Sequence, residues 1–77
     1  MEIDLHGKNL YQARVMLMST LRKATPADYR LRVIHGYHGG DTLRAMVQET
    51  ASSHPKVLRI EKAPNEGETV LVLREYL

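Results

Sequence analysis

Residues Tyr29–Asp41, with the sequence YRLRVIHGYHGGD, decide the architecture of this chain of 77 residues. The first part alternates charged and apolar side chains, which predicts a strand over Tyr29–His35. The second part, GYHGGD, holds three glycines and ends in Asp41, a good N-cap for a helix. A strand that passes through a short glycine-rich loop into a helix begins a strand–helix–strand unit.

A similar unit precedes this segment. Met1–His6 is a short alternating stretch that predicts a strand, with Ile3 and Leu5 toward a core. Asn9 and Gln12 then have the three-residue spacing of a capping box. The predicted helix behind them has one apolar stripe, made by Leu10, Ala13, Leu17, Leu21 and Ala24. A Thr-Pro pair ends this helix after about four turns.

Downstream of Asp41 a second amphipathic helix is predicted, and a His-Pro pair closes it. Its apolar positions are Leu43, Met46, Val47 and Thr50. Val57–Glu61 and Thr69–Arg74 are predicted as two strands, joined by turn residues over 63–67. The predicted order of elements is therefore β-α-β-α-β-β.

This order predicts one α/β domain over residues 1–77. Each strand–helix–strand step is expected to be a right-handed crossover between parallel strands, and the last two strands are expected to be antiparallel. With two helices and four strands, the economical arrangement is a two-layer α/β sandwich. We expect a mixed four-stranded sheet with both helices on one face and the other face open to solvent.

Composition excludes several classes of function. The chain has no cysteine, so a disulfide framework, a thiolate metal site and a cysteine nucleophile are ruled out. No apolar run approaches the ~20 residues of a membrane span, and the first residues are acidic where a signal peptide is basic. We expect a cytoplasmic protein without a membrane partner. The net charge of +2 is concentrated in the first half, a weak indication of an anionic partner.

The segment Ile3-Asp4-Leu5-His6-Gly7 is the first candidate for chemistry. If Ile3 and Leu5 pack inward, Asp4 and His6 share the open face of the sheet. An imidazole beside a carboxylate serves as a general acid or base near neutral pH. The alternative is a surface strand with two solvated polar residues, and for this pentapeptide alone that alternative is favoured.

The glycine-rich loop is the second candidate. Gly36, Gly39 and Gly40 permit close approach of the backbone to a ligand, and the loop opens a helix whose free amides suit a phosphate. Arg44, one turn into that helix, adds positive charge. His35 and His38 lie in the same segment and favour function over an ordinary turn. Because ligands bind at the carboxyl ends of parallel strands, the two candidates are expected to converge; the residues involved are Asp4, His6, His35 and His38.

The open face of the sheet is the third candidate. Arg30 and Arg32 alternate with apolar residues and are expected on the face opposite the helices, where they form a track for a sugar–phosphate backbone. A solvated face without a partner is equally compatible with the charge pattern. The chain has four tyrosines and no Phe or Trp, so sequence-specific recognition of bases by stacked aromatic side chains is not expected.

Taken together, Ile3–Gly7, Ile34-His35-Gly36, Leu43-Arg44 and the segment 63–73 resemble the Smr (small MutS-related) domain family over the whole chain. The resemblance implies an α/β sandwich similar to the C-terminal domain of translation initiation factor three. It also implies nucleic-acid binding, with nicking or endonuclease activity in several members. The family motifs linked to activity match Asp4 and His6, and His35 and Gly36.

The second motif departs from the family pattern. The family reads His-Gly-x-Gly, whereas His38 stands at the fourth position here and the loop is one residue longer. The leading hypothesis is a weak, structure-selective nicking endonuclease for branched or single-stranded DNA or RNA, with Asp4, His6 and His35 as catalytic residues. Phosphates would be held by Gly36, His38, Gly39, Gly40, Arg44, Arg30 and Arg32.

Two alternatives stay open. A non-catalytic module that binds branched or single-stranded nucleic acid is favoured by the altered loop, and a protein-interaction or oligomerisation domain is compatible with the low net charge. The metal requirement also stays open. One aspartate and a few histidines are a thin ligand set for a two-metal nuclease, so Mg²⁺ or Mn²⁺ is a candidate cofactor without an assigned ligand set.

Overall fold

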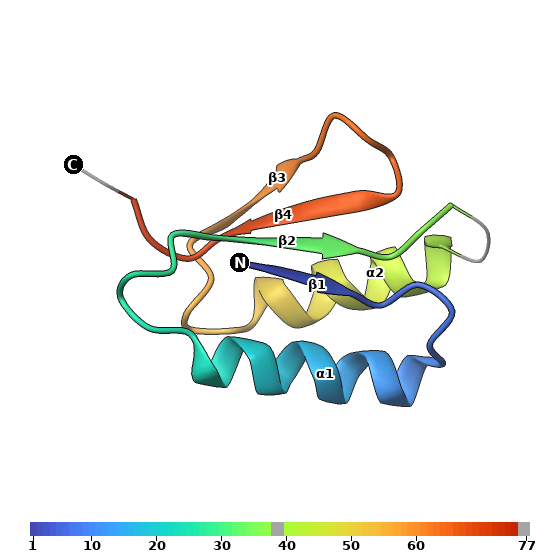
Figure 1. Cartoon of the computed structure of the whole chain (residues 1–77), viewed down its shortest axis with the longest axis horizontal. Coiled ribbons are helices and arrows are strands. Elements are labelled where there is room, and N and C mark those ends of the chain that lie inside the picture. Colours follow the sequence, from blue (N-terminus) through green and yellow to red (C-terminus); the bar gives the residue numbers. More distant parts are fainter. Residues whose placement is uncertain (38–39, 76–77) are drawn as a thin grey trace.

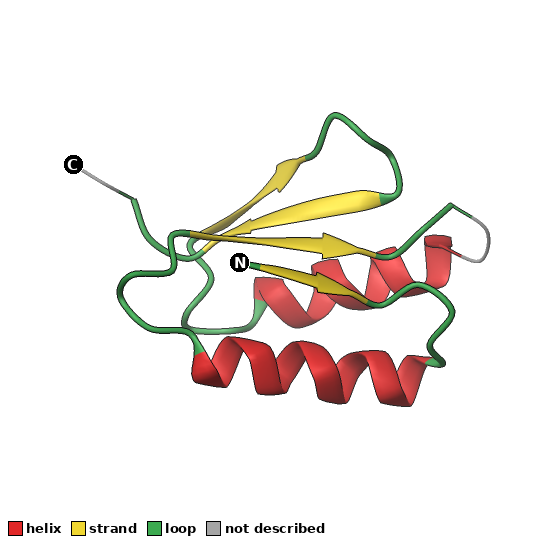
Figure 2. Cartoon of the chain, viewed as in Figure 1, coloured by secondary structure: helices red, strands yellow, loops and turns green. Residues whose placement is uncertain are grey.

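The computed structural model describes residues 1–37 and 40–75. Its elements follow the predicted order: β1 (Glu2–Asp4), α1 (Leu10–Lys23), β2 (Arg30–Ile34), α2 (Gly40–Ser52), β3 (Arg59–Lys62) and β4 (Glu68–Val72). Both helices lie on one face of the sheet, and the other face is open (Figures 1 and 2). The predicted two-layer α/β sandwich is confirmed.

The sheet is mixed, with the strand order β1-β2-β4-β3. β1 and β2 are parallel neighbours, and β4 pairs antiparallel with both β2 and β3. β3 therefore runs parallel to β2, as the crossover rule predicts, but β4 lies between them. The sequence did not predict the order of the four strands across the sheet.

The core lies between the two layers. It is built from the inward side chains of the strands and the facing stripes of the helices: Leu5, Ala13, Leu17, Leu21, Leu31, Val33, Leu43, Met46, Val47, Ala51 and Leu71. The stripe predicted on α1 is correct for Ala13, Leu17 and Leu21, which are fully buried. Leu10 is an exception, because it stands in the first turn and is 39% exposed.

The ends of α1 are fixed by specific hydrogen bonds. The predicted capping box is present: Gln12 N donates to Asn9 Oδ1 at 2.8 Å, and Asn9 N donates to Gln12 Oε1 at 3.3 Å. At the other end, the Lys56 ammonium donates to the Leu21, Arg22 and Ala24 carbonyls at 2.8–3.1 Å. The Leu21 carbonyl also accepts the Ala24 N–H at 3.2 Å. Lys56 thus caps the carbonyl end of α1 and ties the β3 side of the fold to this helix.

Asp41 was predicted as the N-cap of the second helix. This prediction is wrong in detail, because α2 begins at Gly40 and Asp41 lies inside the helix. An acidic side chain in the first turn still favours the helix through the positive end of its dipole. The Asp41 carboxylate also accepts a hydrogen bond from Arg44 Nη2 at 3.0 Å.

Candidate functional site

The carboxyl ends of β1 and β2 meet at one edge of the sheet, on the side where both helices begin (Figure 1). The turn between β3 and β4 reaches the same edge, because the amides of His35 and Gly36 both donate to the Gly67 carbonyl at 2.9 Å. We call this region, formed by residues 4–8, 35–37 and 65–67, the strand-end edge. It contains the two motifs that the sequence analysis predicted to converge.

Asp4 and His6 form a close pair at this edge. His6 Nδ1 lies 2.5 Å from Asp4 Oδ1, and the same oxygen accepts the backbone N–H of His6 at 3.0 Å. Asp4 and His6 lie on the same face at the end of β1, and the chain turns at Gly7. The Asp4 carboxylate therefore faces both the backbone N–H and the ring Nδ1 of His6. The side chains are 51% and 67% exposed, respectively, so the pair is open to a large substrate.

The electrostatics of the pair favour an ionised carboxylate. Hydrogen bonds from the His6 side chain, and then from its backbone, hold the pKa of Asp4 below the ordinary value of 3.8, and the charge of Lys8 acts in the same direction. An ionised carboxylate accepts only, so Nδ1 carries the proton that it shares with Asp4. In the neutral imidazole Nε2 is then the basic nitrogen.

Gly36 connects the two motifs in space. Its φ of +83° lies in the region that favours glycine, and a Cβ at this position would lie 3.3 Å from His6 Cβ. His6 therefore packs directly over the first glycine of the loop. The sequence analysis predicted that the Gly36 backbone amide binds a phosphate. In the structure this amide already donates to the Gly67 carbonyl and is not free for a phosphate.

His35 is brought to the same edge but lies inside the protein. Its side chain is buried, with Nε2 at 2.9 Å from Thr69 Oγ1 and Nδ1 at 3.2 Å from the Gly36 carbonyl oxygen. A carbonyl only accepts, so Nδ1 donates to it and Nε2 pairs with the Thr69 hydroxyl. Both ring nitrogens are thus engaged between β4 and the glycine loop. In this position His35 holds the loop, and its predicted catalytic role stays a prediction.

Of the other loop and helix residues predicted to bind phosphate, the structure describes some and not others. Arg44 is half-buried and lies with Gly36, Tyr37, Asp41 and Glu66 around a hollow of about 80 Å³. Gly40 is the first residue of α2. His38 and Gly39 lie outside the described residues, so their predicted roles stay predictions.

The open face of the sheet is not basic. Arg30 and Arg32 do project from it, as predicted, but acidic side chains of β1, β3 and β4 surround them. Arg32 pairs with Glu2 and, at 3.5 Å, with Glu68. Arg30 lies 3.5 Å from Glu61.

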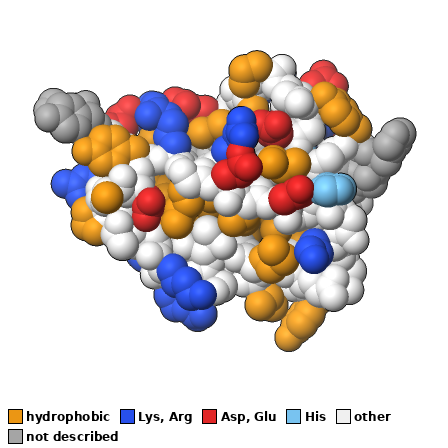
Figure 3. All heavy atoms as spheres, viewed as in Figure 1, with side chains coloured by type: hydrophobic (Ala, Val, Ile, Leu, Met, Phe, Trp, Pro, Cys, Tyr) orange, Lys and Arg blue, Asp and Glu red, His pale blue; other side chains and the backbone are white. Residues whose placement is uncertain are grey.

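A third arginine of this face is paired as well. Arg59 lies 3.0 Å from Glu61 and 2.6 Å from Glu75, and its hydrogen bond lowers the pKa of Glu61. Figure 3 shows acidic and basic side chains intermixed over the sheet side of the molecule. The predicted basic track is therefore wrong as a description of charge, because carboxylates on the neighbouring strands offset the arginines. Phosphate binding by Arg30 and Arg32 stays a prediction.

Sequence reasoning missed two residues of the edge, Lys8 and Tyr37. Lys8 is close enough to act on the pKa of Asp4. Tyr37 is 63% exposed, and its hydroxyl donates to Asn65 Oδ1 at 2.5 Å. The signal for Tyr37 was present in the sequence, as a single large aromatic inside a glycine-rich loop, whereas its contact with Asn65 depends on how the β3–β4 turn packs.

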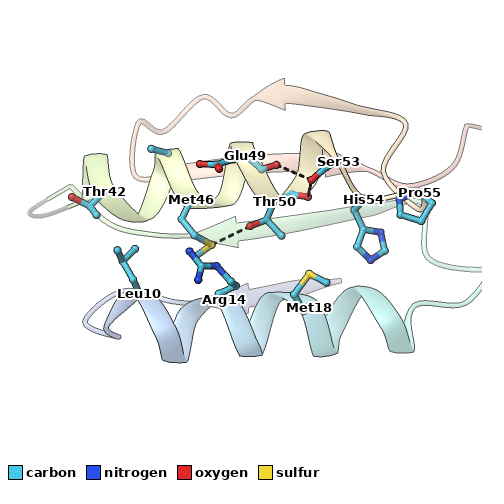
Figure 4. Close-up of a pocket in the computed structure, with 11 residues that line it drawn as sticks. Leu10, Arg14, Met18, Thr42, Met46, Glu49, Thr50, Ser53, His54 and Pro55 are labelled. Carbon is cyan, nitrogen blue, oxygen red and sulfur yellow. Dashed lines mark hydrogen bonds between the residues drawn. The ribbon is translucent and has the colours of Figure 1, made fainter.

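A larger hollow lies elsewhere. It has a volume of about 640 Å³ and lies between the helices, where Leu10, Arg14 and Met18 of α1 face Met46 and Thr50 of α2 (Figure 4). None of the described residues that were predicted for the site lines it.

Two smaller hollows adjoin the strand-end edge, of about 80 Å³ beside Gly36 and about 260 Å³ beside Asn65 and Glu66. The exposed Asp4–His6 pair lines neither of them and lies on open surface, which suits a polymer better than a small enclosed ligand.

Comparisons with known proteins agree with this geometry. The family model of the Smr domain matches residues 3–73. The chain belongs to the Smr domain family. The structure of this Smr domain is similar to the crystal structure of the Smr domain of Thermus thermophilus MutS2, with a TM-score of 0.86 and 29% sequence identity, over 96% of this chain and 98% of that one. A search of curated proteins gave no match.

The family assignment confirms the resemblance noted in the sequence and the α/β fold class. Smr domains are known in general as nucleic-acid-binding domains. Within residues 1–37 and 40–75 of this Smr domain, neither helix is long and apolar enough to cross a membrane.

Proposed function

We propose that this Smr domain binds DNA or RNA along the strand-end edge and cleaves a phosphodiester bond there, with branched or single-stranded nucleic acid as its substrate. The observation that carries the proposal is the exposed Asp4–His6 pair, with Nδ1 of His6 at 2.5 Å from the carboxylate. The pair stands on a surface open to a polymer, in a family of nucleic-acid-binding domains.

His6 acts as the general base in this proposal. Asp4 holds the proton on Nδ1, so Nε2 accepts a proton from the attacking water. The water oxygen bonds to phosphorus, and the bond from phosphorus to the sugar oxygen on the opposite side breaks. The leaving oxygen takes a proton from solvent, and the imidazolium releases its proton to solvent. Positioned acid–base catalysis of this kind contributes about 10²–10⁴ to the rate.

Lys8 and Arg44 supply positive charge near the pair. Lys8 follows the His6 turn, and Arg44 lies at the hollow beside Gly36. The Arg44 guanidinium is shared with Asp41, so only part of its charge is available to a phosphate. We therefore expect weak binding that decreases as the salt concentration rises.

His35 is a positioning residue in this proposal. Its bonds to Thr69 and to the Gly36 carbonyl fix the backbone on which His6 Cβ rests. Its loss is expected to lower the rate by displacing His6, with no change in the pH at which the rate is half-maximal.

No step is routed through a metal ion. In the described part of the chain, no three His, Asp or Glu side chains come together to hold one. The Asp4–His6 pair alone offers few ligands to a metal, and Oδ1 of the carboxylate already accepts two hydrogen bonds. The test nevertheless includes Mg²⁺, Mn²⁺ and EDTA, because a metal bound jointly with a substrate phosphate needs fewer protein ligands.

The test uses end-labelled single-stranded, branched and blunt duplex DNA and RNA, each with the wild-type chain and with His6→Ala. His54→Gln is the matched control, since His54 lines the distant groove between the helices (Figure 4). We expect the wild type and His54→Gln to cleave, and His6→Ala to bind equally well and to cleave at least about 100-fold more slowly.

Other outcomes reject specific parts of the proposal. Binding without cleavage in every condition makes this a recognition module. Absence of binding at low salt removes nucleic acid as the partner and leaves the interaction-domain alternative.

A further inference from the structure

Tyr37 is exposed and at the same time held in place. Its side chain is 63% exposed, yet its hydroxyl donates to Asn65 Oδ1 at 2.5 Å. The same oxygen accepts the Gly67 amide at 2.8 Å, so the acceptor is itself fixed by the β3–β4 turn. A ring anchored by the backbone at one end and by a hydrogen bond at the other has already lost most of its rotational freedom.

Gly67 makes this arrangement possible. A Cβ at Gly67 would lie 3.3 Å from Asn65 Oδ1 and 3.4 Å from Tyr37 Cε2. One edge of the ring thus packs against a turn in which a side chain at Gly67 would be crowded, while most of the tyrosine surface faces solvent.

The ring lies beside the proposed chemistry. Gly36 contacts His6 on one side and Gly67 on the other, and Tyr37 follows directly in the chain. The adjoining hollow, with Arg44 at its rim, measures about 80 Å³. The exposed ring beside it offers a flat face on which a nucleobase can lie.

We infer that Tyr37 is a stacking platform for one unpaired nucleobase, next to the phosphodiester that Asp4 and His6 act on. This inference rests on the proposed function and sharpens its substrate class. Every base has a π-face, so a single platform is tolerant of sequence. In a closed duplex both faces of a base are already stacked, so the edge selects single-stranded or frayed segments.

The experiment compares Tyr37→Leu and Tyr37→Phe with the wild type. The probe is a single-stranded oligonucleotide that carries 2-aminopurine, whose fluorescence is quenched by stacking, and a blunt duplex of the same length is the reference. Tyr11→Leu is the matched control, because Tyr11 is 75% exposed on α1. Thermal unfolding of each variant reports whether it is folded.

We expect Tyr37→Leu to bind the single strand about tenfold more weakly and to lose the quenching, with duplex affinity unchanged. Tyr37→Phe keeps the quenching, and Tyr11→Leu behaves as the wild type. Equal single-strand affinity in Tyr37→Leu and wild type overturns the platform while the proposed function stands. An equal loss for single strand and duplex also overturns it, since the residue is then structural. A wild type that binds neither probe rejects the proposed function and this inference together.

Discussion

Two histidines follow neighbouring parallel strands of this Smr domain, and they differ in almost every physical respect. His6, after β1, is 67% exposed in its side chain and bonds to a carboxylate. His35, after β2, is buried and bonds to a threonine hydroxyl and a backbone carbonyl. The first has a ring nitrogen to offer to a substrate, and the second has both nitrogens engaged inside the protein.

The difference arises from strand position and from side-chain alternation. β1 is an edge strand, and His6 is in phase with the exposed residues Glu2 and Asp4. β2 is internal, and His35 is in phase with the buried Leu31 and Val33. A shared place in the topology therefore does not imply a shared chemical role.

The largest expected effect separates the two histidines by stability. His35→Ala removes a buried ring and leaves Thr69 and the Gly36 carbonyl without their partner, so we expect a loss of about 2–4 kcal/mol in the free energy of unfolding. His6→Ala is expected to shift the midpoint of thermal unfolding by less than about 3 °C. Chemical and thermal denaturation measure both, and similar losses for the two variants would remove the distinction.

The second prediction concerns the glycine that connects them. Gly36→Ala places a side chain at φ +83° and within 3.3 Å of His6 Cβ, whereas Gly7→Ala meets no atom within 4 Å at φ +78°. Both substitutions carry the cost of the left-handed conformation, about 1–2 kcal/mol. We expect Gly36→Ala to be the less stable variant and to cleave more slowly than Gly7→Ala. Equal free energies of unfolding in the two variants would show that the contact between a side chain at position 36 and His6 Cβ does not destabilise the fold.

The third prediction compares the strand-end edge with the open face of the sheet. Lys8→Gln and Arg44→Gln are each expected to weaken binding severalfold and to reduce the slope of log affinity against log salt by about 0.7 for a single strand. Arg30→Gln and Arg32→Gln are expected to change neither quantity, because their charges are offset by Glu61, Glu2 and Glu68. Titrations at several salt concentrations decide this, and the reverse ranking would restore the sheet face as the binding track.

The smallest effect is the titration of Asp4. Its pKa lies below 3.8 when folded, so the stabilisation from its bonds to His6 is complete above 3.8 and is lost as the pH falls through the lower folded value. In His6→Ala the side-chain bond is absent while the backbone bond remains, so the pKa should rise toward 3.8. Carboxyl NMR of the two chains measures the shift, and an identical pKa in both would show that the pair does not form in solution.

The fold could largely be predicted from the sequence because its signals are local. The capping box at Asn9 and Gln12, the α1 stripe and the alternation in β2 each specify one element, and all are present. The position of β4 between β2 and β3 could not be predicted, since it depends on pairing between segments far apart in the chain.

The site could be predicted in part. The placement of Asp4 and His6 on the open face followed from alternation, and the structure brings them together. The alternation along β2 also indicates that His35 is buried, because His35 is in phase with Leu31 and Val33. The sequence analysis instead assigned His35 a catalytic role from its residue type and its motif. The neutralised sheet face and the contact of Tyr37 with Asn65 depend on cross-strand register and turn packing, which no local pattern reports.

Chemical rescue tests the central claim most directly. The measurement is the cleavage rate of His6→Ala and of Asp4→Ala with and without added imidazole, beside the wild type. Because the His6 side chain is 67% exposed, its removal leaves an open position that imidazole can enter from solvent. The account predicts that imidazole restores cleavage by His6→Ala in proportion to its unprotonated concentration, and leaves Asp4→Ala slow. A His6→Ala chain that cleaves as fast as the wild type without imidazole would contradict it.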